Sequence, residues 1–389
     1  MRHGAFGWIV MLMLAGSTLP LSAAGDRSSA EADTLLQEKD AEKKSFTEKM
    51  EITIEKIFRY APLPAVGYST ETSWSFGLAK YNAFRIRSKH LPDSLVQDSK
   101  VVVSGSYSLN KQYNFSIDAD LMHGDNRWNT FLKFSVKGFP SIFYGVGNHT
   151  LKEEGVLTDF KNVSFSPGVN YDLVRRNFIG IKYTLNDYFK VAPLDSVPDE
   201  EPYRKNEGLE SGMEIRYFFD SRDNRARTAR GVYLFTSFDI FDKVLGSDFD
   251  FRTFTLDLRG FFSPLPRLTL AAQLYSRVQG GDVPVQSLAY VGGNRLLRGY
   301  YSRRFREKSS LLLQGEVRFP IVWIFSGVAY GGMGQVAPRY GEMGWNAFHY
   351  AGGAGLRVMF DKKSRSALRF DVSFSDEGHT IYFGFGEAF

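Results

Sequence analysis

Residues 290–300 are the part of the sequence best suited to carry chemistry. They read Tyr-Val-Gly-Gly-Asn-Arg-Leu-Leu-Arg-Gly-Tyr, a stretch rich in glycine and arginine that lipid could not surround. Arg298 requires an anion, and Glu316 on the following strand-like segment is the candidate partner. In one interpretation the stretch folds back into the protein to meet Glu316. In the other, it is an exposed loop whose arginines bind lipopolysaccharide phosphates, and the spacing leaves both open.

Motifs typical of enzymes and metal sites are lacking. The six histidines are scattered, with no pair at metal-ligand spacing, and the chain has no cysteine. It contains no Gly-x-Ser-x-Gly elbow and no Gly-x-x-x-x-Gly-Lys phosphate loop. We therefore expect no enzymatic activity, no metal and no cofactor. A catalytic Ser-His pair assembled from distant segments is the alternative that sequence motifs cannot test.

Composition narrows the class of protein further. Aromatic residues make up 15% of the chain, with 34 Phe and 20 Tyr, which favours strands and membrane-interface girdles over helices. Without cysteine there is neither a disulfide scaffold nor a lipoprotein anchor. The net charge of +5 is small for 389 residues, so nucleic acid is not expected as a partner.

The N-terminus has the pattern of an export signal. Arg2 precedes the apolar run 8–15, and small residues permit cleavage after Ala24, which predicts a signal peptide over residues 1–24. Residues 25–61 are charged and form either a short amphipathic helix or a mobile leader in the periplasm. No later stretch is long and apolar enough for a transmembrane helix. A membrane location would therefore require strands.

From residue 62 to residue 389 the sequence alternates with a period of two. Phe254, Leu256 and Leu258, for example, alternate with polar residues that include Asp257 and Arg259. The apolar faces are large and aromatic, whereas the polar faces carry charges that a soluble core could not hold unpaired. This pattern favours an all-β membrane barrel, with lipid on the apolar face and a polar lumen inside.

We expect a single antiparallel transmembrane barrel of sixteen strands, since an even number lets both ends meet on the periplasmic side. The stretch around Arg298 falls in a long loop between the eleventh and twelfth strands. The predicted strands are 64–70, 74–87, 99–109, 112–123, 127–137, 156–174, 177–191, 210–221, 231–242, 249–263, 267–279, 309–320, 322–337, 349–360, 366–376 and 380–389.

The last predicted strand ends on an aromatic residue. Ile381, Phe383, Phe385 and Phe389 are expected on one face of it. In an exported chain, such an ending resembles the recognition signal of outer-membrane barrels. We therefore predict these four residues as a C-terminal assembly signal.

The loop carries a more specific resemblance. The string Gly292-Gly293-Asn294-Arg295-Leu296-Leu297-Arg298-Gly299-Tyr300 and the strand 314–320 resemble the outer-membrane assembly and translocation barrels of the BamA and TamA type, also called bacterial surface antigen barrels. The turn 220–224 with Gly231 resembles a further motif of that family. The resemblance implies that the loop folds into the barrel. The residues it implies are the anchor motif Arg298, Gly299, Tyr300 and Glu316 and the loop glycines Gly292 and Gly293.

Two departures from the family pattern are visible. Members commonly carry periplasmic POTRA domains, each longer than residues 25–60, so the resemblance is to a member without them. Members also present an acid two residues after an aromatic on the strand following Pro320. Here the matching residues are Tyr330, Gly331 and Gly332, which leaves Glu316 as the family-matched acid for Arg298.

The resemblance implies a role in inserting or translocating a protein or lipid client at the outer membrane. The alternative is a passive or gated pore whose lumen is plugged by the loop. Implied partners are outer-membrane lipid and lipopolysaccharide, the barrel assembly machinery during biogenesis, client proteins and a separate periplasmic protein.

Overall fold

The computed structural model describes residues 62–69, 72–88, 90, 92, 96–174, 176–194, 206–225, 227–322, 324–361 and 366–389. The predicted signal peptide (1–24) and leader (25–61) lie outside these residues. None of the helices in the described part of the chain is long and apolar enough to cross a bilayer.

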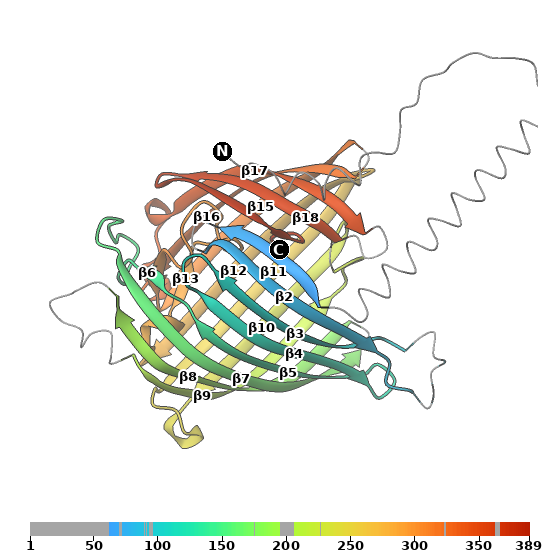
Figure 1. Ribbon diagram of the computed structural model, residues 1–389, viewed down its shortest axis with the longest axis horizontal. Coiled ribbons are helices and arrows are strands. Elements are labelled where there is room, and N and C mark those ends of the chain that lie inside the picture. The colour runs from blue at the N-terminus through green and yellow to red at the C-terminus, as the bar shows by residue number, and fades with distance from the viewer. Residues whose placement is uncertain are drawn as a thin grey trace, which may run out of the picture. The chain divides into compact units, whose positions relative to one another are not determined.

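Sixteen antiparallel strands form a closed barrel, as predicted (Figure 1). Each strand pairs with its neighbour in sequence, and the first pairs with the last. Closure gives the backbone groups of almost every strand a partner on both sides, which a bilayer requires. The barrel strands are β1 (Leu63–Ser69), β2 (Ser73–Phe84), β3 (Ser99–Ser108), β4 (Tyr113–His123), β5 (Trp128–Gly138), β7 (Val156–Val174), β8 (Asn177–Pro193), β9 (Gly208–Asp220), β10 (Gly231–Phe241), β11 (Phe251–Leu265), β12 (Leu268–Gly281), β15 (Ser309–Val322), β16 (Phe325–Ala337), β17 (His349–Asp361), β18 (Ser366–Ser375) and β19 (Gly378–Phe385).

A seventeenth element, β6 (Ser141–Phe143), extends the path of β5 along β7. The break between β5 and β6 falls at Pro140, which has no N–H to donate to the ladder. Pairing resumes on the far side of this proline, opposite residues 156–158 of β7. β6 is therefore a continuation of one barrel strand.

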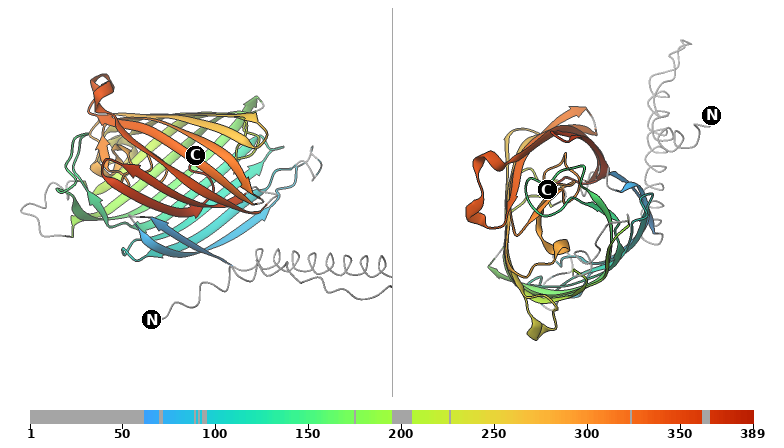
Figure 2. Two further views of the ribbon diagram at one scale, coloured as in Figure 1. Left: turned by 90° about the horizontal axis from the view of Figure 1, so that it is seen from above. Right: turned by 90° about the vertical axis from the view of Figure 1, so that its left-hand side faces the viewer.

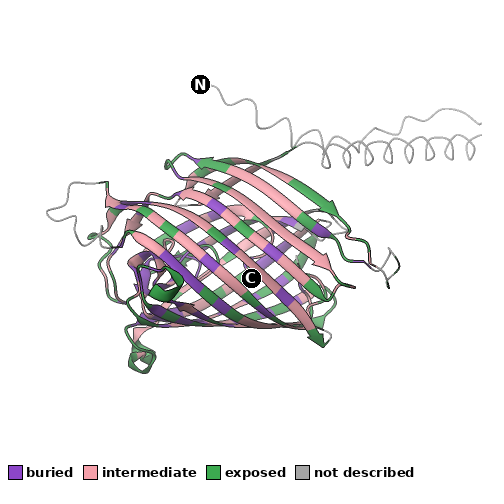
Figure 3. Ribbon diagram, turned by 90° about the horizontal axis from the view of Figure 1, so that it is seen from below, coloured by how far each residue is buried: buried purple, intermediate pink, exposed green. Residues whose placement is uncertain are grey.

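Burial changes from residue to residue along the strands of the wall (Figure 3), as expected where side chains alternate between its two faces. On β11, Thr253 and Asp257 are buried in the interior, whereas Phe254, Leu258 and Phe262 are exposed on the outside. Large apolar side chains on the outer wall suit hydrocarbon, and the polar ones line the lumen.

The barrel closes at a short seam. In the described residues β1 pairs with β19 at one position, Tyr68 with Phe383. By contrast, all 11 residues of β10 pair with β11. Among the described residues, the seam is therefore the junction between barrel strands with the fewest paired positions.

The end of the chain differs from the prediction. β19 ends at Phe385, and Gly386 turns the backbone with a φ of +75°, a conformation that favours glycine. Ile381, Phe383 and Phe385 alternate with the buried Thr380 and Tyr382, as residues of the outer face do. Phe389 does not share that face, because its main-chain oxygen accepts a 3.1 Å hydrogen bond from the buried Arg318 of the inner wall.

The loop between β12 and β15 has structure of its own. It contains the short helix η2 (Val285–Ser287) and the hairpin of β13 (Ala289–Val291) with β14 (Phe305–Glu307). Seen along the barrel, the yellow-to-orange loop lies within the ring of strands (Figure 2). The other short helices are η1 (Lys243–Leu245), η3 (Tyr340–Glu342) and η4 (Trp345–Ala347).

Candidate functional site

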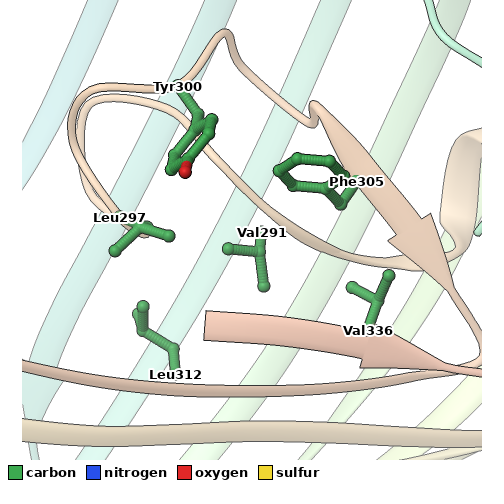
Figure 4. Packing of buried hydrophobic residues seen from close by; sticks show 6 residues of the cluster. All are labelled: Val291, Leu297, Tyr300, Phe305, Leu312 and Val336. Carbon is green, nitrogen blue, oxygen red and sulfur yellow. The ribbon is translucent and has the colours of Figure 1, made fainter. Parts of the chain in front are cut away.

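The long loop is attached to the inner wall by a hydrophobic cluster (Figure 4). Its members are nearly inaccessible to solvent, so the loop gains the burial of large apolar side chains. The cluster fixes residues 291–305 against β15 and β16. It consists of Val291, Leu297, Tyr300 and Phe305 from the loop with Leu312 of β15 and Val336 of β16.

The loop glycines allow this close approach. Gly292 and Gly299 have φ angles of +111° and +127°, which side-chain-bearing residues rarely adopt. A Cβ at Gly292 would lie 2.4 Å from the carbonyl oxygen of Tyr301, and one at Gly299 would lie 2.9 Å from the Cβ of Ala351. Gly293 continues the turn with a φ of +117°.

Arg298 lies between two carboxylates. Its guanidinium donates hydrogen bonds to Glu316 on β15 and, at 2.8 Å, to Asp371 on β18. The three side chains are at most 1% exposed. Burial opposes the charge of Arg298, but Glu316 and Asp371 outweigh this effect and raise the pKa of the guanidinium. The loop arginine is thus charged and held by two carboxylates inside the barrel, where it is not free to bind lipopolysaccharide.

Tyr330 and Gly332 explain why the strand after Pro320 bears no acid. The guanidinium of Arg298 stacks 3.5 Å from the ring centroid of Tyr330, in cation–π geometry. A Cβ on Gly332 would lie 3.2 Å from Leu297 of the loop and 2.8 Å from Gln314. The space that an acidic side chain would need is filled by β15 together with Leu297 of the loop, and Asp371 supplies the second carboxylate. Glu316 is therefore not the sole acidic partner of Arg298.

The ion pair extends into a chain of alternating charges. Glu316 also accepts a 2.8 Å hydrogen bond from Arg318, and Asp371 accepts one of 2.5 Å from Arg357. Arg357 in turn donates a 2.8 Å hydrogen bond to Glu387, beyond the end of β19. Each charge is compensated by a neighbour, which makes the burial of so many ionised groups tolerable.

Gly299 and Tyr300 connect the loop to the last two strands. The Tyr300 hydroxyl donates a 2.5 Å hydrogen bond to Asp376, and Ser375 donates one of 3.0 Å to the carbonyl of Gly299. Tyr382 of β19 bonds to the main chain of both Gly299 and Tyr300, at 3.3 Å each. The Arg-Gly-Tyr triplet is thus bonded to the wall beside the seam.

Reasoning from the sequence paired Arg298 with Glu316 but missed Asp371, Arg357 and Glu387. The alternation of β18 was the available signal, because it places Asp371 on the lumen face. Nothing local shows that β18 approaches residue 298, since that contact depends on how the barrel curves. Of the four predicted end-signal residues, Phe389 alone reaches this network, through Arg318.

The profile of the Omp85 superfamily domain matches residues 100–389. The chain belongs to the Omp85 superfamily. Members of this superfamily are β-barrel proteins of the outer membrane, and the expected kinship with BamA-type barrels is confirmed. A search of curated protein sequences found no significant match.

Several solved structures share the Omp85 barrel. A Haemophilus ducreyi BamA lacking POTRA domains 1–3 superposes with a TM-score of 0.59 at 10% identity, covering 83% of this chain and 69% of that one. CdiB of Acinetobacter baumannii gives 0.54 at 13% identity, and CdiB of Escherichia coli gives 0.56 at 11%. Both cover 83% of this chain but less than two thirds of the CdiB chains, 58% and 62%. At these identities the likeness establishes a common fold.

Proposed function

We propose that this Omp85 barrel assists the insertion of a protein or lipid client into the outer membrane, or its passage across it. The seam carries the proposal, because within the described residues β1 and β19 pair at one position, Tyr68 with Phe383. Opening so short a pairing breaks few hydrogen bonds and exposes two strand edges. An exposed edge can pair with an incoming strand through main-chain hydrogen bonds. This function requires no covalent bond to be made or broken.

The loop would hold the inner wall in shape while the seam opens. Arg298 bonds to β15 and β18, and Tyr300 bonds to Asp376 beyond the end of β18. Through the loop, these contacts connect β18, which lies next to the last strand β19, with β15. In this proposal the loop is kept inside the barrel by its anchor, which consists of Arg298, Gly299 and Tyr300 with Glu316. The loop glycines Gly292 and Gly293 allow its close approach to the wall.

The proposal includes three kinds of partner. The apolar outer wall would contact outer-membrane lipid and lipopolysaccharide after removal of the signal peptide. The barrel assembly machinery would insert the chain, with residues 381–389 as the recognition segment. A separate periplasmic protein would deliver the client.

A gated pore is the second candidate, and one observation favours it. A polar cavity of about 300 Å³ lies inside the barrel, lined by Arg222, Arg259, Gln273, Arg295 and Glu387 among others. If the loop were a gate over this cavity, planar bilayers containing the protein would show a large steady conductance. The insertion proposal predicts low and irregular conductance.

Photo-crosslinking in cells tests the insertion proposal. A photoreactive residue at position 385 would lie on the outer face of β19, where Phe385 is 55% exposed. Position 254 on β11 is a matched control, because Phe254 is 44% exposed on the outer face and is paired with both neighbouring strands, opposite Phe238 and Val278. We expect protein clients, identified by mass spectrometry, from position 385 and not from position 254. Equal capture at both positions would refute the seam as the client site.

A further inference from the structure

The loop contains three more arginines just after the anchor, and they have different surroundings. Arg304 is conventionally paired, donating a 2.7 Å hydrogen bond to Glu377 and others to Thr150. Arg303 and Arg306 form no ion pair with any described residue of the chain. This contrast within one short segment calls for a physical reason.

Arg306 is the clearer case. The residue is 2% exposed, and its Nε donates a 3.1 Å hydrogen bond to the neutral carbonyl of Arg303. Its Nη1 is buried without a hydrogen-bond partner. The guanidinium lies 5.2 Å from the ring centroid of Phe143 on β6 and 5.9 Å from that of Phe160 on β7. A buried guanidinium left without a counter-charge is costly.

Other cations lie near Arg306. Arg303 is half-buried and donates a 3.0 Å hydrogen bond to the carbonyl of Gln286, with its guanidinium 5.0 Å from the ring centroid of Tyr290. Its φ of +58° is an uncommon backbone conformation for arginine, which the surrounding structure must maintain. The charge of Lys137 on β5 is near enough to be repelled by Arg303.

Among the described residues, no carboxylate forms an ion pair with Arg303 or Arg306, and Asp118 is the acid whose charge acts on Lys137. The nearby Glu210 is occupied by hydrogen bonds from Ser287, at 2.5 Å, and Asn186, at 3.2 Å. Burial, reinforced by repulsion from Arg303, lowers the pKa of Arg306 to about 9. A guanidinium with this pKa still carries its charge at neutral pH. The site around Arg303 and Arg306 therefore has an excess of positive charge.

We propose that Arg303 and Arg306, with Lys137, bind a phosphate group between the loop and the β6–β7 wall. The fork of N–H donors on a guanidinium matches two phosphate oxygens, and Nη1 of Arg306 is the donor that lacks an acceptor. Half-buried Arg303 provides the approach from the lumen. The phosphate is either a free anion or the headgroup of a lipid. This site is separate from the anchor and does not depend on the proposed function.

Inorganic phosphate is the first probe, used on the full chain folded in detergent. We expect the thermal unfolding midpoint to rise saturably with phosphate but not with chloride at equal ionic strength. Arg306→Gln should weaken the apparent phosphate affinity about tenfold or more. Arg304→Gln is the matched control: it removes a paired arginine and should leave the phosphate response intact. Should Arg306→Gln fail to fold, Arg303→Gln, at the more exposed position, provides the same comparison.

A second arm separates the two sources of phosphate. The chain is reconstituted in phosphatidylcholine vesicles with or without lipid A, and retained lipid is measured by native mass spectrometry. Retention of lipid A by the unmodified chain and by Arg304→Gln, but not by Arg306→Gln, identifies a headgroup. A response to inorganic phosphate without lipid A retention identifies a free anion. The proposal is overturned if neither occurs, or if Arg306→Gln behaves like the unmodified chain in both arms.

Discussion

Asp371 on β18 accepts a 2.8 Å hydrogen bond from Arg298 in the loop, although 73 residues separate them in the sequence. This contact makes Arg298 a bridge between β15 and β18, because Glu316 on β15 binds the same guanidinium. The loop is therefore fixed by a charge network on the inner face of β15 to β18.

Removing the arginine should release the loop. Arg298→Ala leaves Glu316 and Asp371 buried without their shared partner, and breaking a fully buried pair costs about 3–5 kcal/mol. We expect protease cleavage between residues 280 and 309 in the variant while the barrel still assembles. Arg298→Lys should protect the loop only in part, since an ammonium cannot bind two carboxylates in fork geometry. A loop as resistant in Arg298→Ala as in the unmodified chain would show that the hydrophobic cluster suffices.

Exchanging the charges of Arg298 and Glu316 should fail, contrary to what a simple pair predicts. In Arg298→Glu with Glu316→Arg, the new carboxylate at 298 would face Asp371, which normally lies within hydrogen-bond distance. Adding Asp371→Asn removes that repulsion and should restore part of the loop protection. Proteolysis of the double and triple variants gives the comparison. Full rescue by the double exchange alone would mean that Asp371 contributes nothing.

Two adjacent glycines provide a matched test of the missing family acid. Gly332→Asp would press on Leu297 and Gln314, and overpacking of this kind costs about 1–3 kcal/mol before the added charge is counted. Gly331→Ala is the control, because its Cβ would meet nothing closer than 3.8 Å. We expect the first variant to lower the unfolding temperature and expose the loop, and the second to change neither. If both unfold alike, the space under Leu297 is not what excludes the acid.

The end of the chain is expected to matter more for assembly than for stability. Phe389 touches the lumen side through Arg318, and one aromatic side chain contributes about 1.5–3 kcal/mol when fully buried. Deleting Phe389 should reduce the amount of folded barrel in the membrane by a larger factor than it reduces the resistance of folded barrels to heat. On a gel, the faster-migrating band of unheated samples measures the amount of folded barrel. The temperature at which this band disappears measures resistance to heat. Unchanged abundance would remove Phe389 from the predicted assembly signal.

Strand positions could be predicted because they depend on a local pattern. The predicted strand 156–174 coincides with β7, since alternation and flanking turns specify both of its ends. The contact of Asp371 with Arg298 depends on barrel curvature, which no local pattern encodes. The position of Phe389 was wrong for a similar reason: alternation alone would continue the strand, but Gly386 turns the chain toward Arg357 and Arg318.

The central claim is that the seam between β1 and β19 opens for a protein client, and a reversible lock tests it most directly. The chain has no cysteine, so Tyr68→Cys with Phe383→Cys introduces a single pair at the paired position of the seam. Directly opposed residues of antiparallel strands are close enough for a disulfide. Ala119→Cys with Leu132→Cys places the same lock in the fully paired β4–β5 wall as a control.

The readout is client capture by a photoreactive residue at position 385, in cells, with the seam oxidised or reduced. We predict that oxidation abolishes capture in the seam variant, that reduction restores it, and that the β4–β5 lock has no effect in either state. Undiminished capture through an oxidised seam would contradict the account.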